Sequence, residues 1–225
     1  MAHMKSMIRP TGRRPAETCV RALHSLVTAL ILGAVVQVWG ESAAAAVENR
    51  PRGLVTMRAL ALELLRVEDY EGSIEVYLEI TRHTPNDPKS YYDLAAALSF
   101  IRLYEEAVEP IQIAIRLDPD NLRAQEMAAL IFLNLKRYEE AFAATLKSAE
   151  LGEPTAMYSL VNMYEKGLGV KADQDNAAYW AEQAAGHGHL GAMAIMEEAY
   201  RTGRFGRTID PKLAGAWARR LREAE

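Results

Sequence analysis

The feature that most constrains the fold of this chain is a repeat with a period of 34 residues. Tyr70, Tyr104 and Tyr138 are evenly spaced, and the four-residue sequence Tyr-Glu-Glu-Ala occurs at 104 and again at 138. Each copy contains two segments of helical apolar periodicity joined by a very short connection, as in 91–102 and 104–117. A helical hairpin this small leaves apolar surface on both sides, so the copies must stack on one another.

The central copy resembles the tetratricopeptide repeat (TPR) family. It has aromatic, leucine, small and proline residues where the family pattern requires them, at Tyr91, Leu94, Ala95, Tyr104, Ala107, Ala114 and Pro119. Three copies in step cover 54–154. The outer copies depart from the pattern at Ser73, Ile80, Ser148 and Gly152, which bears on local packing and not on the fold.

The rhythm changes after Pro154, where residues 156–189 resemble the Sel-like repeat (SLR), a relative of the TPR with a longer turn that contains glycine. The matching residues are Ala156, Leu160, Tyr164, Gly167, Gly169, Val170, Ala177, Ala178, Trp180, Ala184, Ala185 and Gly188. A second copy follows at 192–224, with one inserted residue near Phe205 and Gly206. Together the resemblances imply an all-α fold, a right-handed α-solenoid of about five hairpins and ten helices.

The first 46 residues have the layout of a secretory signal peptide. A basic segment precedes an apolar run at 26–36, and small residues suited to cleavage follow at 42–46. Met1–Met4 has the form of a tag remnant. The alternative is a retained anchor, because 22–40 contains no charged residue and is long enough to cross a bilayer.

This reading gives a domain organisation of four parts. A signal peptide or anchor occupies 1–46, a linker 47–53, three TPR-type hairpins 54–154, and two Sel-like repeats 155–225. The Sel-like repeats are expected to continue the TPR stack.

Charge and cysteine content argue against several classes of protein. The formal net charge is −4, and residues 1–46 hold five basic and two acidic residues, so the remainder holds 21 basic and 28 acidic residues. Such a body gives no general reason to bind nucleic acid. The single cysteine, Cys19, lies in the segment expected to be removed, which excludes disulfides and cysteine chemistry from the folded part.

No pattern in the chain requires a reaction centre, and we predict no catalytic residue, no metal and no cofactor. Adjacent carboxylates such as Glu105 and Glu106 point about 100° apart on a helix. Residues 167–169 lack the continuation of a phosphate-binding loop. His187 and His189 with Met157, Met163, Met193 and Met196 have the ligand types that copper(I) prefers, but turn and core positions explain them. A copper-handling protein and an accessory subunit of an envelope enzyme remain alternatives.

The TPR resemblance implies a concave face, lined by the first helix of each hairpin, that holds a partner segment. Its groove positions fall on Arg58, Leu62, Arg66, Lys89, Tyr92, Phe100, Arg123, Glu126, Leu130 and Asn134. The four basic residues among them suggest a strip for carboxylate-rich segments. We therefore predict an exported, non-catalytic scaffold or adaptor in the bacterial periplasm that binds an envelope protein, and that contacts a membrane only if 22–40 is retained.

Overall fold

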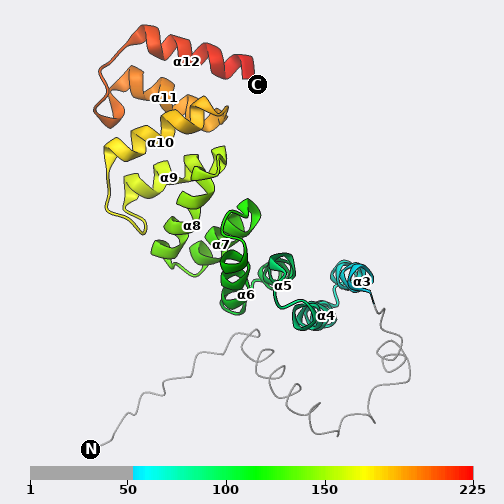
Figure 1. Cartoon of the computed structure of the whole chain (residues 1–225). Helices are drawn as coiled ribbons and strands as arrows, with labels where there is room; N and C mark the ends of the chain where they lie inside the picture. The colour runs from blue at the N-terminus through cyan, green and yellow to red at the C-terminus, as the bar shows by residue number, and fades with distance from the viewer. Residues whose placement is uncertain (1–52, 225) are drawn as a thin grey trace, which may run out of the picture. The chain divides into compact units, whose positions relative to one another are not determined.

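The structure is a computed structural model that describes residues 53–224 (Figure 1). The predicted signal segment, the anchor alternative at 22–40 and Cys19 lie outside the described residues. Within them, all regular structure is helical. The helices are α3 (Leu54–Arg66), α4 (Tyr70–His83), α5 (Pro88–Phe100), α6 (Tyr104–Leu117), α7 (Leu122–Asn134), α8 (Tyr138–Glu150), α9 (Pro154–Lys166), α10 (Gln174–Gly186), α11 (Leu190–Thr202) and α12 (Pro211–Ala224), with a 3₁₀ turn η1 (Arg204–Gly206).

These ten helices form five consecutive hairpins, as the sequence predicts. Each helix packs against the next along the chain, and α5 also contacts α7 (Figure 1). We call the odd-numbered helices the first helices of their hairpins and the even-numbered ones the second helices. The part of the chain from Gly53 onward is one compact unit with the architecture of an α-solenoid.

The tyrosines that define the period occupy equivalent places. Tyr70, Tyr104 and Tyr138 are the first residues of α4, α6 and α8. This confirms the expected 34-residue structural unit.

A small residue at the fourth position of each second helix lets the two helices of a hairpin approach closely. Ala107, Ala141 and Ala177 hold this position in α6, α8 and α10, and none has solvent exposure. In α4 the position is Ser73, whose buried hydroxyl donates a hydrogen bond of 2.9 Å to the carbonyl of Ala61. The departure from alanine is tolerated because the hydroxyl has a partner.

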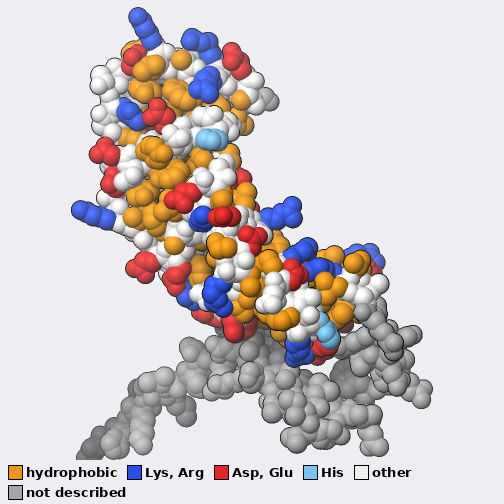
Figure 2. Space-filling model, viewed as in Figure 1, with side chains coloured by type: hydrophobic (Ala, Val, Ile, Leu, Met, Phe, Trp, Pro, Cys, Tyr) orange, Lys and Arg blue, Asp and Glu red, His pale blue; other side chains and the backbone are white. Residues whose placement is uncertain are grey.

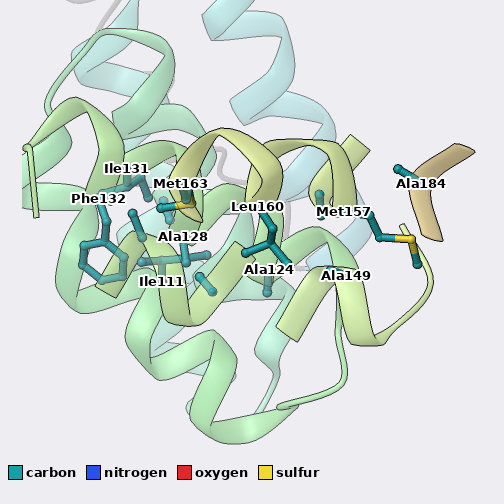
Figure 3. Packing of buried hydrophobic residues seen from close by; sticks show 14 of the residues in the cluster. Ile111, Ala124, Ala128, Ile131, Phe132, Ala149, Met157, Leu160, Met163 and Ala184 are labelled. Carbon is teal, nitrogen blue, oxygen red and sulfur yellow. The ribbon is translucent and has the colours of Figure 1, made fainter. Parts of the chain in front are cut away.

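One apolar core runs through all the hairpins. Figure 3 shows its central part, where Ile111 of α6, Ile131 of α7 and Leu160 of α9 are fully buried with Ala128 between the helices. Burying large apolar side chains of this kind stabilises a fold by about 1.5–3 kcal/mol each. The core therefore continues across the change of repeat type at Pro154.

Helix starts follow the expected capping chemistry. Asp87 caps α5 by accepting a hydrogen bond from the Lys89 amide, and Pro88 is the first helical residue, where no amide hydrogen is needed. The helix therefore begins three residues before the start of the apolar segment at 91–102 and ends at Phe100, two residues before the end of that segment. The predicted bounds 104–117 of α6 are confirmed.

The turns inside the TPR-type hairpins share a left-handed residue. Glu68, Arg102 and Lys136 have φ of 64°, 63° and 59°, and each lies between a first and a second helix. All three side chains are exposed to solvent. A non-glycine residue is therefore accommodated at the cost of local backbone strain alone.

The turn between α9 and α10 packs against another part of the protein. Gly167 and Gly169 have positive φ of 67° and 71°, as glycine in a tight turn predicts. A Cβ added to Gly169 would lie 1.9 Å from the carbonyl oxygen of Tyr138, at the start of α8. At this position glycine is required by close approach as well as by backbone conformation.

No helix among residues 53–224 is long and apolar enough to cross a bilayer.

Candidate partner-binding site

A cleft lies on the side of the stack formed by α7, α9 and α11, which are first helices. Its volume is about 510 Å³, within the usual range for ligand sites. The lining residues are Leu133, Tyr158, Ser159, Val161, Asn162, Met163, Glu165, Leu168, Ile195 and Arg204. Most of this lining comes from α9, so the cleft belongs mainly to the first Sel-like hairpin.

The walls of the cleft are apolar and its exposed polar group is an amide. Leu133 from α7 is 41% exposed, and Ile195 from α11 is half-buried. Asn162 is exposed, and its amide makes no hydrogen bond within the described part of the chain. Tyr158 is held in place by stacking on His189, with ring centroids 4.3 Å apart.

An arginine fixes one end of the cleft. Arg204 Nη2 lies 2.7 Å from Glu165 Oε1 of α9, and Arg204 Nη1 lies 2.6 Å from Glu198 Oε2 of α11. The Nε group also donates to Glu165 Oε1, at 3.2 Å. These bonds raise the pKa of Arg204 against the opposing effect of burial, which is the largest single influence. The guanidinium therefore ties the turn after α11 to both first helices.

Comparison with solved structures agrees with the repeat resemblance. The Sel1 repeat protein from Oxalobacter formigenes superposes with a TM-score of 0.55 and 25% sequence identity, over 77% of this chain and 74% of that one. The fold is that of a TPR and Sel1-like repeat solenoid. MamA 41-end from Desulfovibrio magneticus RS-1 shares it with a TM-score of 0.54 and 19% identity, over 76% of this chain and 94% of that one.

Sequence comparison gives a partial match. Small glutamine-rich tetratricopeptide repeat-containing protein 2 of Mycosarcoma maydis is 27% identical over 118 residues, which are 52% of this chain. The matched part spans about a third of that curated relative, 32% of its length. No family model matches the chain. Solenoids of these repeats serve in general as scaffolds for protein–protein interaction.

The basic residues predicted for the groove of this solenoid differ in their partners. Arg58 Nη2 lies 2.6 Å from Asp87 Oδ2, and Arg58 Nε lies 3.2 Å from Asp93 Oδ2, so this side chain joins α3 to α5. Lys89 forms an ion pair with Asp93 at 2.7 Å. Arg66 pairs with Glu63 of its own helix. These three cations are engaged within the solenoid.

The apolar groove residues are mostly open to solvent. Phe100 is 68% exposed, Leu62 59% and Leu130 47%, and each lies on a first helix. Tyr92 is half-buried and packs against the core. The ring of Phe100 lies 6.1 Å from that of Tyr70, between centroids. Exposed apolar side chains therefore lie on α3, α5 and α7, and Leu130 lies three residues before the cleft residue Leu133 on α7.

The remaining predicted residues belong to α7. Arg123 and Glu126 are exposed, and Asn134 donates a hydrogen bond to the Leu130 carbonyl. Partial burial raises the pKa of Glu126, and the carboxylate of Glu153 adds to this effect while Arg123 opposes it. Glu126 therefore lies in a local environment that disfavours further negative charge.

Sequence reasoning missed the residues of the cleft itself. Glu126 and Leu130 are the fifth and ninth residues of α7, and the same positions of α9 are Tyr158 and Asn162. Carrying the groove positions past Pro154 would have found both. Arg204 has no such signal, because it lies in a turn and reaches the cleft through tertiary contacts.

The residues considered for copper are engaged elsewhere. Met157, Met163, Met193 and Met196 are buried in the core. His187 contacts the Gln183 carbonyl at 2.9 Å, and His189 caps α11 by accepting from the Ala192 amide. Among residues 53–224 no group of three or more His, Cys, Asp or Glu side chains is arranged to hold a metal.

Basic and acidic side chains are intermingled over the face of the protein seen in Figure 2.

Proposed function

We propose that this chain is an exported, non-catalytic adaptor that holds a segment of an envelope protein on the face of its first helices. The observation that carries the proposal is the cleft between α7, α9 and α11, with apolar walls and the unpaired Asn162 amide. An amide with free donor and acceptor groups suits the backbone of an extended peptide. Two further exposed apolar side chains on first helices are Leu130, three residues before the cleft residue Leu133 on α7, and Phe100 on α5.

A binding role fits the state of the charged groups better than a catalytic one. Arg204 and Glu165, the charged residues that line the cleft, are paired with each other. Such groups hold the cleft in shape instead of exchanging protons with a substrate. The alternative of an accessory subunit is compatible with the same surface, since such a subunit also binds another protein.

Export rests on the composition of residues 1–46, with basic, apolar and small-residue segments in the order of a signal peptide. A fusion of alkaline phosphatase to Glu225 tests it, because that enzyme becomes active only after export. We expect activity from the full-length fusion, in a bacterial host, and none after deletion of residues 5–46. Equal activity of the two fusions would contradict export.

Photo-crosslinking in cells tests the binding face. A photoreactive residue at Ser159, which lines the cleft, leaves the Asn162 amide in place and should capture a partner, whereas the same residue at Ala143, exposed on second helix α8, should not. Equal capture from both positions would refute the assignment. The variant Lys89→Glu/Arg123→Glu tests the predicted basic strip separately, since retention of the same partner at full yield would remove those two residues from the interface.

A further inference from the structure

We infer that the cleft between α7, α9 and α11 accepts a partner segment in which an apolar side chain lies next to a lysine or arginine. This inference deepens the proposed function and rests on it. It concerns the chemistry of the segment, whereas the proposed function concerns only the face that is used.

The apolar side chain of the partner segment is inferred from the walls of the cleft. Leu133 and Ile195 reach the cleft from α7 and α11, on either side of α9. A volume of about 510 Å³ holds a few side chains, and covering an apolar wall releases its surface from water. Asn162 lies beside these walls with both amide groups free to pair with the segment's backbone.

The lysine or arginine of the partner segment is inferred from the ion pairs that Arg204 already makes. Its guanidinium already donates to Glu165 and to Glu198, so an incoming carboxylate would meet two carboxylates and a cation that is already paired. Two acids against one base leave a surplus negative charge at this end of the cleft. Glu165 Oε2 and Glu198 Oε1 have no hydrogen bond among the described residues, so both can accept from an ammonium or guanidinium group.

The same sign of net charge holds for the three helices that form the cleft. The charged side chains of α7, α9 and α11, with Glu153 before α9 and Arg204 after α11, are five acids and four bases. They are Glu126, Glu153, Glu165, Glu197, Glu198, Arg123, Lys166, Arg201 and Arg204. Partial burial, and after it the Glu153 carboxylate, raise the pKa of Glu126 while Arg123 lowers it, and a cation from the partner would favour the charged form of this carboxylate.

The test compares two fluorescein-labelled peptides of eight residues, one repeating Leu-Lys-Ser-Gly and one repeating Leu-Glu-Ser-Gly, by fluorescence anisotropy with the purified protein. We expect the lysine peptide to bind more tightly, by about fivefold for each ion pair formed, with a preference that shrinks at high salt. Equal binding, tighter binding of the glutamate peptide, or no binding of the lysine peptide at about 1 mM would overturn the inference.

A pair of variants locates the preference. Glu165→Gln/Glu198→Gln leaves Arg204 without charged partners, so the preference should reverse toward the glutamate peptide. The control Glu109→Gln/Glu139→Gln removes the same charge from exposed positions on second helices and should keep the lysine preference. If both variants lose the preference alike, net charge and not the cleft explains it. Should the first variant fail to fold, Glu126→Gln alone is expected to weaken only the lysine peptide.

The crosslinked partner separates the two proposals. Capture at Ser159 of a segment without lysine or arginine would overturn this inference and leave the proposed function standing. Failure to capture any partner at Ser159, with the peptides still discriminated, would instead count against the proposed function.

Discussion

The TPR-type and Sel-like parts of this protein solve the same problem, a turn between paired helices, in two ways. In the TPR-type part three residues connect the helices, and the left-handed position is held by an exposed side chain such as Lys136. In the first Sel-like hairpin seven residues, 167–173, make the connection, and Gly169 presses against the backbone of Tyr138. The short turn needs only an unusual φ, whereas the long turn is also a packing element.

The connection in the second Sel-like hairpin, residues 203–210, is one residue longer, and its left-handed residues differ from Gly169. Phe205 and Gly206 have φ of 59° and 67°, and a Cβ added to Gly206 would meet nothing within 4 Å. The Phe205 side chain is buried, with Arg204 over the ring at 4.9 Å. Gly206 is therefore favoured by its φ alone, whereas Gly169 is required by its φ and by the close approach to Tyr138.

The largest effect is expected at a position that the two parts share. Ala107→Arg in α6 and Ala177→Arg in α10 each place a long cation at a site without solvent exposure. Each should cost more than about 3 kcal/mol, because overpacking is joined by burial of a charge. Chemical denaturation measures both. Loss in one part and none in the other would break the idea that the hairpins share one packing rule.

The next effect separates the two kinds of turn. Gly169→Ala forces a Cβ into the Tyr138 carbonyl and should lower the free energy of unfolding by about 2–4 kcal/mol. Gly203→Ala is the matched control, because its nearest contact would be an ordinary 3.4 Å and only the φ of 82° penalises it. We expect about 1 kcal/mol there. Equal melting temperatures for the two variants would contradict the packing role of residue 169.

A third prediction concerns Arg58, which joins neighbouring first helices in the TPR-type part as Arg204 does in the Sel-like part. Arg58→Ala removes a cation that contacts Asp87 and Asp93 of the next hairpin, and should cost about 1–3 kcal/mol at neutral pH. Arg66→Ala, which breaks only an exposed pair within α3, should change stability by under about 1 kcal/mol.

The cost of losing Arg58 depends on pH. Burial raises the pKa of Asp87, but hydrogen bonds from Ser90, Arg58 and the Lys89 amide outweigh it, so the pKa lies below its ordinary value. Stability from a lowered carboxyl pKa is present above about pH 4 and is lost as the pH falls further. Urea unfolding at pH 7 and pH 3 should therefore show a smaller difference between wild type and Arg58→Ala in acid. A difference that grows in acid would contradict the role of Asp87.

The smallest effect is expected in the short turns. Lys136→Gly removes the strain of a left-handed lysine but gives the unfolded chain more freedom, and the two terms nearly cancel. The melting temperature should move little, corresponding to less than about 1 kcal/mol. A large loss would show that the Lys136 side chain has a role that its exposure does not suggest.

The period of the chain made the fold predictable, because each spacing maps onto one structural position. Tyr104 and Leu117 bound α6 as expected. Asp210 caps α12, with its carboxylate accepting a hydrogen bond from the Lys212 amide. Helix α5 starts at Pro88, where the cap Asp87 and the proline favour a helix start, although its apolar pattern begins only at Tyr91.

The site was harder to predict than the fold. The positions on α3, α5 and α7 were found by register, but register says nothing about side-chain partners, and Arg58 turned out to bridge two helices. The cleft needed the same register carried into α9, together with Arg204 brought in from a turn 39 residues beyond Glu165. Such a contact depends on tertiary packing and leaves no trace in local sequence.

The contact between Gly169 and Tyr138 makes the change of repeat type at Pro154 a poor place to divide the molecule. A fragment that starts at Pro154 would lack the surface on which residues 167–173 pack, and a fragment that ends there would have the start of α8 exposed. Each fragment cut at that point should expose surface that is buried in the whole stack. We therefore expect limited proteolysis to leave the stack from Gly53 onward intact, and this is the unit to keep in engineering.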